Sequence, residues 1–136
     1  METTLNQLIF VNIASYCEPH LEFTLDSLFG SAFMPQNLRV GLCDQSDSGN
    51  LVWLNKKPYR NRVRYLGFPK DQARGSAWAR SVASSMYEDE DFYLQVDGHT
   101  LFDPGWDRTL LEAYLLAEKT HKKPVITTYP MPFKFE

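Results

Sequence analysis

The sequence has no long hydrophobic run and no N-terminal targeting pattern. A membrane-spanning helix needs about 20 consecutive apolar residues, and no segment of the 136 residues approaches this length. The N-terminus also lacks the basic stretch and apolar core of a secretory signal. We therefore expect a cytoplasmic protein with no membrane span.

Cysteine and positive charge are also scarce. The two cysteines, Cys17 and Cys43, each fall at the end of a predicted strand, and in a reducing compartment we expect both to be free thiols. Lys and Arg number 14 against 17 Asp and Glu, which gives a formal charge of -3. Because a phosphate backbone requires a dense positive face, this balance argues against a nucleic-acid partner, and we expect none.

Several catalytic and nucleotide-binding motifs are missing as well. The dinucleotide fingerprint G-x-G-x-x-G and the phosphate loop G-x-x-x-x-G-K-[ST] do not occur, which argues against dehydrogenases and NTPases. The nucleophile motif G-x-S-x-G is absent too, and neither cysteine has a sequence-local catalytic partner. The sequence therefore offers no hydrolase nucleophile.

What is present is a regular alternation of strand and helix patterns in one domain, residues 1–136. Helices are predicted from near Pro19 to Gly30, over about 71–87 and after Pro104. Apolar or β-branched runs predict strands at 8–14, 38–43, 63–68, 92–97 and 124–130, with a polar loop at 44–50. This order predicts an α/β fold with a mainly parallel sheet and helices on both faces.

Polar residues follow three of these strands directly, and ligands of parallel sheets bind beyond the carboxyl ends of the strands. These residues are Ser15 and Tyr16, Asp44 and Gln45, and Asp97 and His99. We expect the three pairs to gather at one edge of the sheet.

The segment Asp97-Gly98-His99 is the most informative of the three, because it ends an apolar strand that we expect to be buried. Asp97 and His99 project to the same side of an extended chain, and Gly98 leaves room for a ligand. This pattern predicts a site for Mg²⁺ or Mn²⁺ that holds a nucleotide diphosphate. The alternative is that Asp97 caps a turn and His99 is an ordinary loop histidine.

Two ligands do not complete the coordination of such a cation. Diphosphate oxygens, water and a third protein ligand would fill the other positions. Candidates for that ligand are Asp103, Asp107 and His121, or a residue beyond the last one of this chain.

Two further residues have plausible roles at the same edge. Arg74 is expected at the start of a helix, where it could fork onto phosphate oxygens, although a solvated arginine is the alternative. Asp44 could accept a hydrogen bond from N3–H of a uracil, or could simply begin a polar loop. Arg80 is expected to be a salt-bridge partner.

Taken in order, the sequence blocks resemble the polypeptide N-acetylglucosaminyltransferase family, which includes cytosolic enzymes that glycosylate hydroxyproline. The blocks are Ile9–Tyr16, Thr24–Phe29, Leu38–Cys43, Ala73–Gly75 with Trp78–Arg80, Tyr93–His99, Pro104–Asp107 and Thr127–Pro130. The resemblance implies a GT-A fold, a UDP-sugar donor (UDP-GlcNAc by family precedent), a divalent metal, retention of the anomeric configuration, and a protein or glycan acceptor.

The resemblance also assigns roles to residues. Asp97 and His99 match the metal-binding D-x-H motif of the family. Ser15, Tyr16 and Asp44 match the nucleoside end of the donor pocket, and Arg74 matches an arginine near the diphosphate and sugar.

The chain departs from the family in one residue and in length. Gly98 stands where the family usually has serine. Family members also continue well past residue 136, so we expect an N-terminal donor-binding half. Such a half could be a non-catalytic or truncated UDP-sugar-binding domain. An Mg²⁺-binding regulatory domain fits less well, since those domains offer several carboxylates rather than a histidine.

Overall fold

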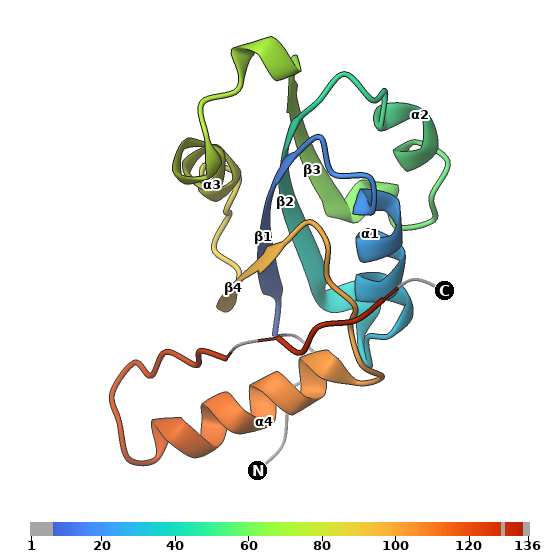
Figure 1. Cartoon of the computed structure of the whole chain (residues 1–136). Helices are drawn as coiled ribbons and strands as arrows, with labels where there is room; N and C mark the ends of the chain where they lie inside the picture. Colours follow the sequence, from blue (N-terminus) through green and yellow to red (C-terminus); the bar gives the residue numbers. More distant parts are fainter. Residues whose placement is uncertain (1–6, 129, 135–136) are drawn as a thin grey trace.

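Four parallel strands form one sheet in the order β3-β2-β1-β4 in the computed structural model, which describes residues 7–128 and 130–134 (Figure 1). The strands are β1 (Ile9–Tyr16), β2 (Leu38–Gln45), β3 (Val63–Phe68) and β4 (Phe92–Asp97). The helices are α1 (Leu21–Gly30), α2 (Leu51–Leu54), α3 (Ser76–Ser84) and α4 (Trp106–Glu118). Figure 1 shows α1 and α3 on opposite sides of the sheet and α4 beyond the ends where the strands begin. The predicted α/β fold is confirmed.

The burial of both faces of β1 follows from its composition. Phe10, Val11 and Ile13 have no exposed surface, as a continuous apolar run requires when both faces of a strand are covered. The strand pairs with β2 on one side and with β4 on the other, so that Ile9 lies opposite both Leu38 and Phe92. The ends of β1, β2 and β4 are thereby brought to one edge.

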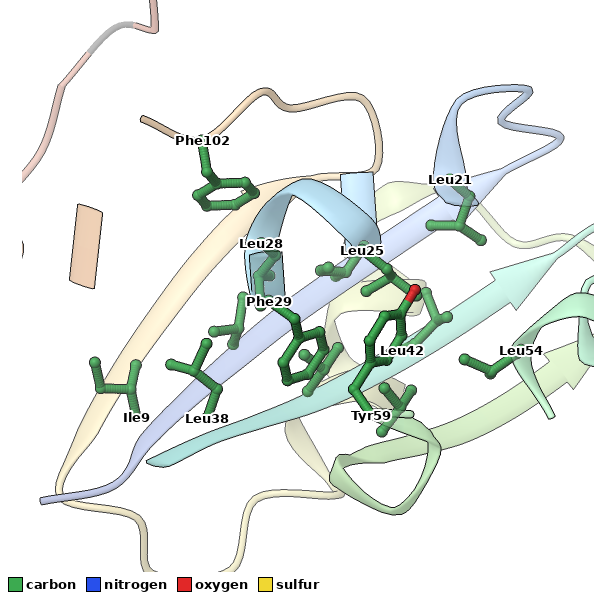
Figure 2. Packing of buried hydrophobic residues seen from close by; sticks show 14 of the residues in the cluster. Ile9, Leu21, Leu25, Leu28, Phe29, Leu38, Leu42, Leu54, Tyr59 and Phe102 are labelled. Atoms are coloured by element: carbon green, nitrogen blue, oxygen red, sulfur yellow. The ribbon is translucent and has the colours of Figure 1, made fainter. Parts of the chain in front are cut away.

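The larger core lies between α1 and the sheet. The predicted inner face of this helix is correct, because Leu21, Thr24, Leu25, Leu28 and Phe29 are all buried. Figure 2 shows the apolar side chains of α1 over the strands, and the ring of Phe29 stacks on that of Tyr59 with centroids 4.4 Å apart.

The face of the sheet opposite α1 has a smaller core, in which Ala79 and Ala83 of α3 pack on Cys43 of β2. Gly41 permits this close approach. A Cβ atom at Gly41 would lie 2.4 Å from the ring of Phe10 and 2.9 Å from the carbonyl oxygen of Ala83. The two thiols, Cys17 and Cys43, are free as expected.

Two predicted boundaries at the carboxyl edge of the sheet were wrong. Strand β2 continues through Asp44 and Gln45, which pair with Gly67 and Phe68 of β3 rather than starting a loop. Helix α3 begins at Ser76 instead of near residue 71, because Gly75 has φ +89°, a conformation that no helical residue adopts. Arg74 therefore precedes the helix.

Two predicted strands also differ from expectation. Strand β4 is an edge strand rather than a buried one, and Tyr93 is 48% exposed. In the predicted strand 124–130, residues 124–128 and 130 form no strand, and Tyr129 lies outside the described residues. Pro124 and Pro130 at its ends lack the amide hydrogens that strand pairing requires.

The longest helix of the described residues, α4, has 13 residues. No helix in this part of the chain is long and apolar enough to cross a membrane. The cytoplasmic location stays a prediction.

Candidate functional site

An open cleft of about 460 Å³ lies at the carboxyl edge of the sheet. Its walls come from the ends of β1 and β4, from Gln45 at the end of β2, and from the segment that leads into α3. Of the predicted site residues, Ser15, Tyr16, Asp97 and His99 line this cleft. The expected gathering of the three strand ends is therefore observed, with β2 represented in the cleft by Gln45 rather than by Asp44.

Asp97 and His99 lie close together where the cleft meets the end of β4. Oδ2 of Asp97 lies 3.9 Å from Nε2 of His99, and the two side chains are 59% and 62% exposed. The other carboxylate oxygen, Oδ1, lies 3.8 Å from Nη2 of Arg80, which confirms the predicted ion-pair role of that arginine. Both groups are thus close together and open to a ligand.

The turn that carries these two residues is anchored by Thr24 of α1. Its hydroxyl donates to the carbonyl oxygen of Gly98 at 2.7 Å and accepts from the backbone N–H of Thr100 at 3.0 Å. The hydroxyl of Thr100 donates in turn to the carbonyl oxygen of Asp97 at 2.9 Å. These bonds fix the direction in which the chain leaves β4.

Glu18 is a site residue that the sequence did not reveal. Its Oε1 lies 2.8 Å from Nδ1 of His99, and its Oε2 accepts from the backbone N–H of His20 at 2.8 Å. Glu18 and His99 are 81 positions apart in the sequence. The one available signal was that Glu18 follows the end of β1 closely.

Asp44 is buried below the cleft and does not line it. The residue is 1% exposed, and its carboxylate accepts hydrogen bonds from Tyr65 OH at 2.7 Å, Asn50 Nδ2 at 2.9 Å, Ser46 Oγ at 2.8 Å and Ser15 Oγ at 3.4 Å. Burial raises the pKa of Tyr65 above its usual range, and the bond to Asp44 raises it further. Both oxygens of Asp44 are therefore engaged within the protein.

Arg74 lies in an adjoining depression of about 470 Å³, next to the wall of the cleft. Its backbone N–H donates to Oε1 of the buried Gln45 at 3.0 Å, and its guanidinium carbon lies 5.6 Å from the ring centroid of Trp78. Ala73 borders both hollows. Arg74 therefore lines the depression that adjoins the cleft of Asp97 and His99, and does not line the cleft itself.

The three candidates for a third metal ligand lie in different environments. Asp107 is buried and accepts from the backbone N–H groups of Phe33 and Met34 at 2.7 and 2.9 Å, so it has a structural role. His121 follows the end of α4, and Asp103 lines a groove that adjoins Asp97. Among the described residues, no group of three His, Cys, Asp or Glu side chains is arranged to hold a metal.

Comparison with known proteins gives a family and a fold. The family model described as "Glycosyltransferase (GlcNAc)" matches residues 8–60 and 54–136. Two crystal structures of Staphylococcus aureus TarS, one of residues 1–349, are each 22% identical in sequence with a TM-score of 0.60. They cover 83% of this chain, which spans 33% and 20% of the two TarS chains.

No curated protein matches the sequence significantly. The similarity to TarS shows a shared fold of the GT-A type. The family model covers nearly all of the chain in two overlapping segments. This chain is therefore a member of the GlcNAc glycosyltransferase family.

Proposed function

We propose that this chain is the donor-binding part of a metal-dependent, retaining glycosyltransferase. It would transfer GlcNAc or a related sugar from a UDP-sugar to a hydroxyl group on a protein or glycan. Membership of the GlcNAc glycosyltransferase family supports the class of reaction. The pairing of Asp97 with His99 in an open cleft at the carboxyl edge of a parallel sheet supports the location of the donor.

The Asp97 and His99 pair fits a divalent cation. Their facing atoms are 3.9 Å apart, which is less than twice a metal–ligand bond of about 2.1 Å, so both can reach one ion. A carboxylate and an imidazole suit Mn²⁺, and Mg²⁺ is the second candidate. When bound, the cation stabilises the negative charge of the departing diphosphate.

The other residues would bind and orient the nucleotide. Tyr16 is 60% exposed at the end of β1 and offers a ring to the nucleoside, beside the hydroxyl of Ser15. Asp44 supports this end from below, because its oxygens hold Ser15 and the loop that follows β2. Arg74 would add positive charge near the diphosphate and sugar, and its attraction to the diphosphate would grow as negative charge develops there.

A second candidate is a domain that binds a UDP-sugar without transferring the sugar. One observation favours it: among the described residues no group of three His, Cys, Asp or Glu side chains is arranged to hold a metal, so Asp97 and His99 supply two of the ligands that a cation needs. Both candidates use the same donor site and differ in the transfer step.

Calorimetry tests the donor site. UDP and UDP-GlcNAc are titrated with and without Mn²⁺ into wild type, Asp97→Ala and the control Glu112→Ala, which removes an exposed carboxylate of α4. We expect Mn²⁺-dependent binding to wild type and the control and its loss in Asp97→Ala. The proposal is wrong if neither nucleotide binds wild type under any condition.

Release of UDP separates the two candidates. The chain is incubated with UDP-GlcNAc, Mn²⁺ and peptide or glycan acceptors, and free UDP is measured. Acceptor-dependent release supports the transferase, whereas binding without release supports the binding domain.

A further inference from the structure

The contact between Glu18 and His99 determines which ring nitrogen of His99 is available to a ligand. A neutral imidazole carries its proton on one nitrogen and a lone pair on the other. A carboxylate only accepts hydrogen bonds, so the 2.8 Å contact with Oε1 of Glu18 places the proton on Nδ1. The lone pair is then on Nε2, the atom that faces Asp97.

The turn after β1 holds Glu18 firmly in this position. Cys17 has φ +48°, which reverses the chain, and its N–H donates to the carbonyl oxygen of Gln45 at 3.0 Å. The side chain of Glu18 is 14% exposed, and its second oxygen is fixed by the N–H of His20. The carboxylate is therefore set before any ligand binds.

Gly98 provides the space that Glu18 occupies. A Cβ atom at Gly98 would lie 3.3 Å from Cγ of Glu18 and 3.2 Å from Cβ of Ser15, so both neighbours would have to shift. The glycine at this position thus keeps Glu18 close to the turn that carries His99.

We propose that Glu18 is a positioning residue, which holds His99 with Nε2 unprotonated and directed toward the cation shared with Asp97. The metal part of this inference rests on the proposed function. Glu18 is less suited to be a ligand itself, because both its oxygens already accept hydrogen bonds and little of its side chain is exposed. Carboxylates that orient a histidine in this way raise metal affinity.

The tautomer of His99 can be measured without metal. Long-range ¹H–¹⁵N NMR at mildly alkaline pH should show Nδ1–H in wild type and a shift toward Nε2–H in Glu18→Ala. Glu18→Gln keeps an acceptor oxygen and should stay closer to wild type. Glu22→Ala, which removes an exposed carboxylate of α1, is the control and should leave the tautomer unchanged. An unchanged tautomer in Glu18→Ala overturns the proposal.

Binding of Mn²⁺, followed by the EPR signal of the free ion, tests the consequence. We expect Glu18→Ala to weaken binding about 10- to 100-fold, Glu18→Gln less, and Glu22→Ala not at all. The double variant Glu18→Ala/His99→Ala should bind no more weakly than His99→Ala, because Glu18 acts through the imidazole. A further loss in the double variant would make Glu18 a ligand and overturn the positioning role.

The two measurements separate this inference from the proposed function. A folded wild-type chain that binds no Mn²⁺ overturns the metal site, and the tautomer result then decides alone whether Glu18 sets His99. A chain that binds Mn²⁺ with the same affinity in Glu18→Ala leaves the metal site intact and overturns the role of Glu18.

Discussion

Substitution of Asp44 by alanine should destabilise the chain strongly. The change leaves Tyr65 OH and Asn50 Nδ2 without their acceptor in a region where Asp44 is 1% exposed. An unpaired buried donor costs about 1–3 kcal/mol. The hydroxyls of Ser46 and Ser15 also donate to Asp44, but Ser46 is half-buried, where water can replace the lost acceptor, and the bond from Ser15 is long at 3.4 Å, so Tyr65 and Asn50 account for most of the loss. We expect a loss of about 3–4 kcal/mol, a large part of the roughly 5–15 kcal/mol that stabilises a domain.

Urea unfolding followed by far-UV circular dichroism measures this loss. Asp44→Asn keeps one acceptor oxygen and the side-chain shape, so its loss should be smaller. Asp71→Ala removes an exposed carboxylate and should change the unfolding free energy by less than about 0.5 kcal/mol.

The energetic coupling between Asp44 and Tyr65 shows whether lost hydrogen bonds cause the loss of stability in Asp44→Ala. In a double-mutant cycle, Tyr65→Phe should cost less in the Asp44→Ala background than in wild type, since its partner is already gone. The reasoning is refuted if Asp44→Ala costs less than about 1 kcal/mol and abolishes UDP binding. Asp44 would then be a ligand contact rather than a structural centre.

Three further predictions concern other parts of the chain. Burial raises the pKa of Glu90, but hydrogen bonds and charge from Arg64 outweigh burial and lower this pKa below its ordinary 4.5. The stability that ionised Glu90 adds is therefore present above pH 4.5 and lost as the pH falls below it. The difference in unfolding free energy between wild type and Glu90→Gln, measured in urea, should become smaller at this lower pH. Burial, and after it the charge of Asp44, raises the pKa of the Cys43 thiol to about 11. Iodoacetamide should therefore modify only the exposed Cys17 in the native chain, which mass spectrometry can show. Labelling of both cysteines would contradict the burial of Cys43 under α3. Gly75→Ala places a side chain at φ +89° and should cost about 1–3 kcal/mol in thermal unfolding, whereas no loss would mean that α3 starts differently.

Much of the fold could be predicted because local patterns agree with the tertiary structure. The apolar run of β1 and the helical spacing of α1 each indicate their own burial. The position of β4 at the edge of the sheet could not be predicted, since the order of strands depends on pairing between distant segments. The apolar residues of this segment suit a central strand and an edge strand with one covered face equally well, and β4 alternates half-buried and exposed residues.

The candidate site, like the fold, could be predicted only in part from the sequence. Asp97 and His99 could be identified because two residues of one strand end share a side. Glu18 could not, since it meets His99 only after β1 and β4 lie side by side. The position of Arg74 before α3, rather than inside it, depends on the positive φ of Gly75, and the sequence alone does not show that angle.

The most direct test of the account is a crystal structure of the chain with Mn²⁺ and UDP, recorded with anomalous scattering from manganese. We predict an anomalous peak within bonding distance of Oδ2 of Asp97 and Nε2 of His99, next to the diphosphate. The carboxylate of Glu18 should still accept the hydrogen bond from Nδ1 of His99. A peak elsewhere, or UDP bound away from the ends of β1 and β4, would contradict the proposed site.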